Sequence, residues 1–99
     1  MPYMIRTYDK PDAAELRAAH RAAHLEYLRD YTARILAAGG FLNDDGSVGK
    51  GGMIVLDTDS RAEAEALVAN DPFTLAGVFE KVEIQRWRKV FYNGVDGSL

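Results

Sequence analysis

Three segments of the chain carry apolar patterns that are typical of β-strands. Residues 3–8 are rich in β-forming side chains, and residues 53–57 form a short apolar run typical of a buried strand. Residues 78–91 alternate between apolar and polar positions until the phase slips near residues 85–86, which predicts a bulge in a long strand. A further short strand can be placed at residues 41–42.

A long stretch without proline or glycine follows the first strand, and alanine, leucine, arginine and glutamate dominate it. Asp12 and Glu15 have the spacing of a capping box, so the pattern predicts a helix from about residue 12 to residue 38. The glycine pair at residues 39–40 is expected to end this helix. The glycine-rich residues 41–52 are expected to form a loop.

Two shorter helices are predicted later in the chain. Ser60 and Glu63 form a second capping box, which opens a helix over residues 60–69 that Asn70 would end in a left-handed conformation. An aspartate followed by a proline then predicts a new helix start, which gives a short helix over residues 71–76.

The order of these elements is β-α-β-β-α-β, which is the ferredoxin-like motif of the α+β class. Helices in this motif cover one face of the sheet, so something else must cover the other face. A second copy of the chain is the simplest cover, and we therefore expect a homodimer. Residues 1–92 are expected to form a single domain, and residues 93–99 a flexible C-terminal tail.

Composition excludes several classes of partner and cofactor. The chain has 99 residues, no cysteine and a net charge of −3, which excludes disulfides, iron–sulfur clusters and cysteine-ligated zinc. A mildly acidic chain is a poor candidate for binding nucleic acid, because phosphate contacts need clustered lysine and arginine. The sequence shows neither an apolar run of about 18 residues nor a signal peptide, so we expect a cytoplasmic protein that does not bind membranes.

Polar side chains gather on the helix stripe that should face the sheet. A helical projection places His20, His24, Arg17 and Tyr27 in one sector, with Arg21 at its edge. Two interpretations stay open, namely core histidines satisfied by hydrogen bonds and a functional site. The two histidines are four residues apart, as in some metal sites, but only a carboxylate could complete the ligand set. We therefore expect no metal and no other cofactor.

Three separate stretches resemble the YciI-like (YCII-related) family. They are residues 8–10, a helical group made of Arg17, Arg21, His24 and Leu25, and residues 71–91, from the Asp-Pro-Phe step to the closing Trp-Arg-Lys-Val-Phe sequence. The resemblance covers residues 3–91, which is nearly the whole chain. It implies a ferredoxin-like fold that forms a dimeric α+β barrel.

The resemblance also implies particular site residues. It places the family's His–Asp pair at His24 and Asp71, and it matches Asp9 and Arg17 to further family positions. Some members of the family eliminate HCl from a chlorinated hydroxyhydroquinone, and the resemblance permits that activity here without selecting it.

The chain departs from the family pattern at two positions. Gly52 stands where serine is common, so a role for a hydroxyl group at that position is in doubt. Phe41 stands where proline is common, and it is expected to change the rim of the pocket and the substrate that the pocket prefers.

These residues suit proton transfer to and from a small molecule. Histidine exchanges protons near neutral pH, so His24 would act as general base or acid while Asp71 orients its ring. Asp9 is a candidate second proton acceptor, and Arg17 would hold an anionic group. We expect a small cofactor-independent enzyme that performs elimination, isomerisation or hydrolysis on an aromatic, hydroxyquinol-like compound. Three aromatic side chains are candidates for contacting this substrate: Tyr8, Tyr27 and Phe73.

Two alternatives from other classes stay open. One is a non-catalytic domain that binds a small ligand or a partner and keeps the pocket. The other is a cofactor-free oxygenase or a heme-binding barrel, because similar folds host both. A histidine that is paired with a carboxylate suits axial heme ligation poorly, so the heme version is the weaker of the two.

Overall fold

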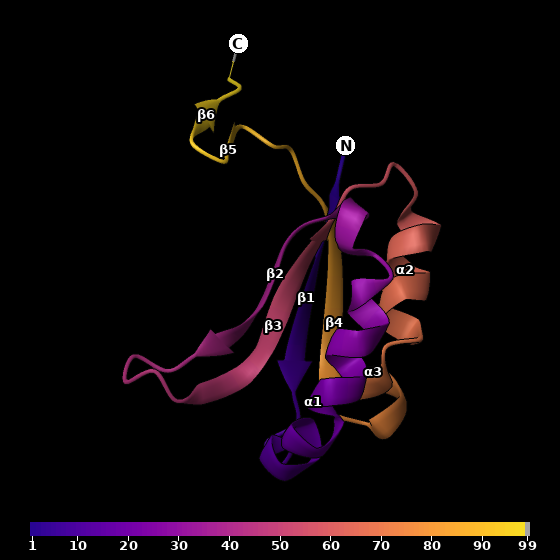
Figure 1. Cartoon of the computed structure of the whole chain (residues 1–99), viewed down its shortest axis with the longest axis vertical. Helices are drawn as coiled ribbons and strands as arrows, with labels where there is room; N and C mark the ends of the chain where they lie inside the picture. Colours follow the sequence, from indigo (N-terminus) through magenta and orange to yellow (C-terminus); the bar gives the residue numbers. More distant parts are fainter. Residues whose placement is uncertain (99) are drawn as a thin grey trace.

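The computed structural model describes residues 1–98 and contains a four-stranded antiparallel sheet. Its strands are β1 (Tyr3–Asp9), β2 (Ile35–Leu42), β3 (Val48–Leu56) and β4 (Phe79–Arg86). They lie in the order β2-β3-β1-β4 (Figure 1), which is the strand order of a ferredoxin-like fold. The predicted α+β class and ferredoxin-like fold are therefore confirmed.

Three α-helices lie on one face of this sheet (Figure 1). They are α1 (Ala14–Arg29), α2 (Arg61–Ala69) and α3 (Pro72–Ala76), and a short 3₁₀ helix, η1 (Thr32–Arg34), connects α1 to β2. No helix within residues 1–98 is long and apolar enough to cross a membrane.

The core lies between the sheet and the helices. Alternate side chains of β1 are buried toward the helices, and the others are only half-buried on the opposite face. The main cluster of buried residues comprises Tyr3, Ile5, Leu28, Ile54, Leu56, Ala64, Leu67 and Val68. A smaller cluster of Ala13, Phe73 and Val78 lies beside α3 and brings an aromatic ring next to the site described below.

The two later helices begin where the sequence predicts. Ser60 caps α2 by accepting a hydrogen bond from the backbone N–H of Glu63 at 3.2 Å. Asp71 caps α3 by accepting a hydrogen bond from the backbone N–H of Phe73 at 2.8 Å. Asn70 does end α2, but its φ of −98° is not left-handed, so that detail of the prediction is wrong.

The predicted helix over residues 12–38 is too long at both ends. Its N-cap is Ala13, without a side-chain hydrogen bond, so Asp12 does not cap it. The helix ends at Arg29, and residues 35–42 form β2 along the edge of β3. Alanine and leucine favour a helix only weakly, and pairing with β3 overrides that preference.

The glycines expected in a loop lie mostly within the β2–β3 ladder. Gly40 pairs with Gly52, and only residues 43–47 form the turn between the two strands. Gly51 has a φ of +91°, and a Cβ atom there would lie 2.0 Å from the carbonyl oxygen of Thr7. Only glycine fits this position, because β1 and β3 approach so closely.

The last predicted strand is also shorter than expected. β4 ends at Arg86, and the register shift lies between Tyr8 and Asp9 of β1 rather than at residues 85–86. Two further short strands, β5 (Phe91–Tyr92) and β6 (Val95–Asp96), pair with each other as a hairpin. This hairpin lies beyond the same end of the sheet as the N-terminus (Figure 1).

Candidate active site

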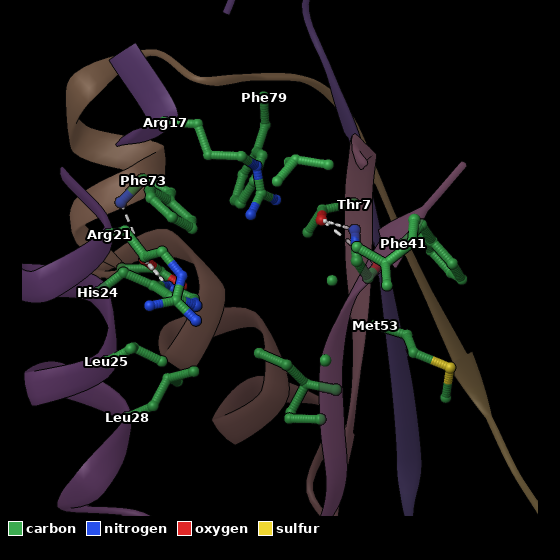
Figure 2. Close-up of a pocket in the computed structure, with 18 residues that line it drawn as sticks. Thr7, Arg17, Arg21, His24, Leu25, Leu28, Phe41, Met53, Phe73 and Phe79 are labelled. Carbon is green, nitrogen blue, oxygen red and sulfur yellow. Dashed lines mark hydrogen bonds and ion pairs between the residues drawn. The ribbon is translucent and has the colours of Figure 1, made fainter. Parts of the chain in front are cut away.

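A cavity of about 380 Å³ lies between α1, α3 and the β2–β3 side of the sheet. The α1 wall carries Arg17, Arg21 and His24, together with Leu25 and Leu28 (Figure 2). The sheet side is open because Gly40 and Gly52 lack side chains that would fill it. The result is a half-open cleft with polar groups on the helix wall and a backbone floor.

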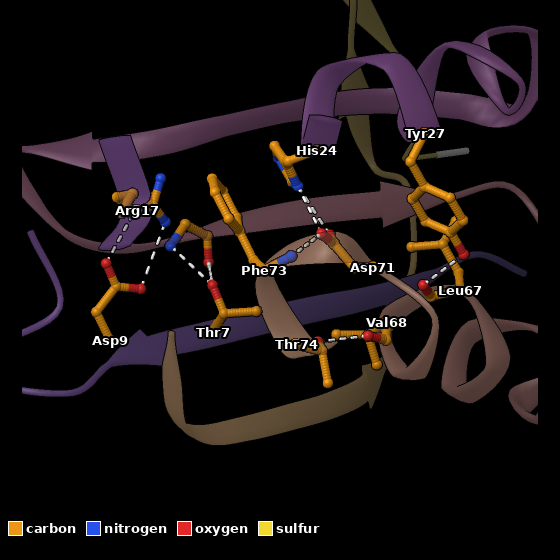
Figure 3. A network of polar contacts seen from close by, with 11 residues as sticks. Thr7, Asp9, Arg17, His24, Tyr27, Leu67, Val68, Asp71, Phe73 and Thr74 are labelled. Carbon is orange, nitrogen blue, oxygen red and sulfur yellow. Dashed lines mark hydrogen bonds and ion pairs between the residues drawn. The ribbon is translucent and has the colours of Figure 1, made fainter. Parts of the chain in front are cut away.

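His24 and Asp71 meet at this cavity across 47 positions of sequence. The Nδ1 atom of His24 lies 2.8 and 2.9 Å from the two carboxylate oxygens of Asp71 (Figure 3). The Asp71 side chain is 1% exposed, and that of His24 is 17% exposed. Because an ionised carboxylate only accepts hydrogen bonds, Nδ1 carries a proton and donates it, which leaves Nε2 for a substrate.

Local structure explains why Asp71 is so well fixed. Its carboxylate also accepts the hydrogen bond from the Phe73 backbone N–H that caps α3. Proline follows at the first helical position, where its fixed φ favours the start of a helix. One carboxylate therefore both starts a helix and holds the imidazole ring of His24.

The ring of Phe73 packs against the imidazole ring of His24. It stacks on the His24 ring with a centroid separation of 4.0 Å and an angle of 15° between the planes. The guanidinium carbon of Arg17 lies 4.6 Å from the centroid of the same ring, so Phe73 lies between the two side chains (Figure 3). Phe73 is only 1% exposed, which makes it a rigid support.

Asp9 lies behind this group, at the end of β1. The Nε atom of Arg17 donates to one oxygen of Asp9 at 2.7 Å, and Nη2 donates to the other at 3.4 Å. The Asp9 side chain is 4% exposed and does not line the cavity. The structure thus brings Asp9 together with Arg17, and its role as a second proton acceptor stays a prediction.

The two tyrosines that sequence reasoning placed near the substrate lie away from the cavity. Tyr8 points to the opposite face of the sheet, where its hydroxyl donates to Glu83, and this bond raises the pKa of Tyr8. Tyr27 donates to the carbonyl oxygen of Leu67 at 2.8 Å, and burial raises the pKa of its hydroxyl. Their contact with a substrate stays a prediction.

Sequence reasoning missed two polar residues that line the cavity. Arg21 lies on α1 between Arg17 and His24; it stood at the edge of the helical stripe and in the family motif but was given no role. Thr7 accepts a hydrogen bond from the backbone N–H of Gly52 at 3.0 Å. The alternation of β1 places Thr7 on the helix side of the sheet, so strand parity could have identified it.

His20 does not join His24 in a metal site. It is half-buried and does not line the cavity. Within residues 1–98, no group of three or more histidine or acidic side chains is arranged to hold a metal ion.

The sequence as a whole matches a known family. The profile of the YCII-related domain matches residues 1–88. The chain belongs to the YCII-related family. Among its relatives are the proteins named YciI of Escherichia coli O6:H1 and Shigella flexneri, each 36% identical over 99 residues. These matches cover 92% of this chain and 100% of each relative.

A solved structure of similar fold gives the family a chemical context. It is the 5-chloro-2-hydroxyhydroquinone dehydrochlorinase TftG from Burkholderia phenoliruptrix AC1100, in complex with 2,5-dihydroxybenzoquinone. This YCII-related protein is 33% identical to TftG, with a TM-score of 0.81, and the match covers 89% of this chain and 94% of TftG.

Proposed function

We propose that this YCII-related protein is a small enzyme that acts on an aromatic, hydroxyquinol-like compound by acid–base catalysis. The observation that carries the proposal is the hydrogen bond from His24 Nδ1 to Asp71 at the wall of a cavity. The similarity to TftG, which binds a dihydroxybenzoquinone, supports an aromatic substrate. Elimination of HCl is the reaction favoured by that similarity, and isomerisation would use the same groups.

The roles of His24 and Asp71 follow from the directions of their hydrogen bonds. With Nδ1 donating to Asp71, the lone pair on Nε2 can accept a proton from a substrate hydroxyl. The resulting imidazolium is stabilised by the adjacent carboxylate. It can return the proton to a ring carbon, so one histidine can serve as base and then as acid.

Loss of HCl from a chlorinated hydroxyhydroquinone fits these roles. A proton moves from a hydroxyl oxygen to the ring carbon that bears chlorine, which creates a carbonyl group and an sp³ carbon. A second hydroxyl then loses its proton to His24, its electrons form the second carbonyl, and chloride leaves with the C–Cl electron pair. The products are a hydroxyquinone, chloride and a proton, which His24 releases to water.

Other side chains in the site would hold the ring. Arg17, fixed by Asp9, presents its remaining guanidinium nitrogen toward Gly40 on the cavity floor. Phe73 fixes the imidazole plane by stacking on it. Tight positioning of this kind lowers the barrier because the reacting groups need less reorganisation.

The first prediction concerns His24 itself. Replacing His24 with asparagine should lower the rate of chloride release from 5-chloro-2-hydroxyhydroquinone by about 10²–10⁴-fold, because the proton-transfer group is lost. Chloride release and thermal unfolding should be measured together, so that lost folding is not mistaken for lost chemistry.

His20→Asn is the matched control for this experiment. His20 lies one helical turn earlier on α1 and outside the cavity, so this variant should turn over at the wild-type rate. A wild-type protein that releases no chloride would exclude dehydrochlorination. A folded His24→Asn variant with full activity would exclude acid–base catalysis by this residue.

A further inference from the structure

The two arginines that line the cavity differ in electrostatic state. Arg17 has its charge balanced by Asp9 through two hydrogen bonds, and both side chains are at least 86% buried. Arg21 makes no ion pair and no side-chain hydrogen bond within residues 1–98, and it is exposed. Of these two guanidinium groups, only that of Arg21 has no carboxylate partner within residues 1–98.

Helix geometry places Arg21 beside the proton-transfer group. It lies four residues after Arg17 and three residues before His24, and side chains at these spacings are neighbours on a helix surface. Figure 2 shows all three on the α1 wall of the cavity. A ligand in contact with His24 is therefore within reach of Arg21.

The charges around the cavity favour an anion. The charges of Arg17 and Asp9 cancel, and Asp71 faces His24 and the N-terminus of α3 instead of the open space. Arg21 is then the positive charge of the cavity lining that has no carboxylate partner within residues 1–98, whereas the negative charge of Asp71 is directed at His24 and the start of α3. A planar guanidinium with five donors matches the oxygens of a carboxylate, a phenolate or an ionised hydroxyquinone.

We propose that Arg21 binds an anionic oxygen of the substrate, so that the site selects aromatic compounds in their ionised form. Arg17 is then a positioning residue that supports Phe73. This inference rests on the proposed function, which gives the substrate as an aromatic compound. It adds that the bound substrate is negatively charged and that Arg21 recognises this charge.

The chemistry of the hydroxyquinone product and that of the phenolic substrate both agree with this assignment. A hydroxyl group conjugated to a quinone carbonyl is a vinylogous carboxylic acid, and it ionises far more readily than a simple phenol. A phenolate also supplies the electron density that expels chloride from the ring. An arginine at the mouth would hold that oxygen while His24 handles the proton on another.

Binding of two matched ligands tests the proposal. Titration calorimetry should measure the affinity of 2,5-dihydroxybenzoquinone, which is anionic, and of 2,5-dimethoxybenzoquinone, which carries no charge. For the wild-type protein we expect tighter binding of the anion. Arg21→Gln should weaken binding of the anion by about tenfold or more while changing that of the neutral ligand by less than about threefold. Arg21→Lys should recover part of the loss.

Arg29→Gln controls for a general change in charge. Arg29 is an exposed arginine two turns further along α1, paired with Glu26, so its loss removes the same charge without touching the cavity. Equal weakening by Arg21→Gln and Arg29→Gln would overturn the proposal. So would unchanged anion affinity in Arg21→Gln, or a wild-type protein that does not bind 2,5-dihydroxybenzoquinone.

The proposed function is tested by measurements other than these ligand titrations. Chloride release by the wild-type protein and its loss in His24→Asn test the acid–base reaction, whatever the ligand affinities show. Anion binding that depends on Arg21, without chloride release, would support the present inference and exclude dehydrochlorination. Turnover without Arg21-dependent binding would do the reverse.

Discussion

Asp71 performs two tasks with one carboxylate, and a single substitution can separate them. One oxygen caps α3 through the backbone N–H of Phe73, and both oxygens lie within hydrogen-bonding distance of His24 Nδ1. Asparagine caps helices about as well as aspartate does. It carries no charge, however, and its amide group can donate to an imidazole nitrogen as well as accept from one.

Asp71→Asn should therefore lower turnover by about 10²–10⁴-fold, because His24 loses both its fixed tautomer and the adjacent negative charge. The melting temperature should shift by only a few degrees, since the cap survives. Nitrogen-15 chemical shifts of the imidazole ring should show a tautomer mixture in the variant and an Nδ1-protonated ring in the wild type. Equal turnover and equal tautomers in the two proteins would mean that Asp71 caps α3 and has no role in holding His24.

Sequence reasoning succeeded at the residues whose spacing is local and failed where a side chain's face was not considered. The contact between His24 and Asp71 was predicted from family resemblance, because nothing local joins positions 47 apart; in the structure His24 Nδ1 lies 2.8 Å from an oxygen of Asp71. Tyr8 and Asp9 are adjacent in β1, so they point to opposite faces of the sheet and could not both enter one site. Arg21 was noticed at the edge of the helical stripe but given no role, because sequence alone does not separate it from an ordinary solvated arginine.

Among the elements, the strands with strong local patterns were predictable and β2 was not. β1 carries a clear alternation, and α2 and α3 carry caps, so their positions follow from short-range rules. β2 has alanines, which favour a helix, and a glycine pair, which favours neither a helix nor a strand. It becomes a strand because the edge of β3 offers backbone partners, and that information is not local.

In the backbone of this chain, the close approach of β2 and β3 predicts that a side chain at position 52 destabilises the ladder. A Cβ atom there would lie 2.5 Å from the carbonyl oxygen of Gly39 and 3.2 Å from Cα of Gly40. Gly52→Ala should therefore lower the free energy of unfolding by about 1–3 kcal/mol, because backbone atoms must move apart. Urea unfolding followed by circular dichroism measures this change.

Gly39→Ala provides the control in the same ladder. No atom lies within 4 Å of a Cβ at Gly39, so its stability should be unchanged or slightly higher. Similar unfolding curves for the two variants would show that the β2 backbone moves away from position 52 at little cost in free energy.

An ion pair joins η1, just before β2, to α2 and predicts a pH dependence of stability. Hydrogen bonds from Arg34 and then Thr58 lower the pKa of Glu63 from its usual value of 4.5. A lowered folded-state pKa stabilises the native protein above the unfolded pKa, and that stabilisation is lost as the pH falls below about 4.5. Glu63→Gln should remove this part of the acid sensitivity, so its stability should decline less steeply there.

Urea unfolding at several acidic pH values tests the role of Glu63. Glu65→Gln is the control, because Glu65 pairs only with Arg61 of the same helix and connects no two elements. Parallel stability curves for wild type and Glu63→Gln between pH 5 and 3 would mean that the ion pair between η1 and α2 contributes nothing to stability.

On the scale of the whole molecule, the sheet is covered unequally. All three α-helices lie on one face (Figure 1). The side chains of Met4, Arg6 and Tyr8 on the other face are half-buried. The guanidinium of Arg6 lies 4.6 and 4.3 Å from the ring centroids of Tyr8 and Phe41, and its buried Nε atom has no hydrogen-bond partner within residues 1–98. A buried donor without an acceptor is costly unless a partner supplies one.

A second copy of the chain is the partner that we expect on this outer face. Light scattering at micromolar concentration should then give twice the chain mass of 11.0 kDa. Met4→Asp should shift the protein toward monomers, because it introduces an unpaired charge at the centre of the interface. Leu75→Asp is the control, since Leu75 is exposed on α3 on the helix side and its charge should leave the dimer intact. A monomeric wild-type protein, or a Met4→Asp dimer as stable as wild type, would leave the outer face without this cover and Arg6 without its acceptor.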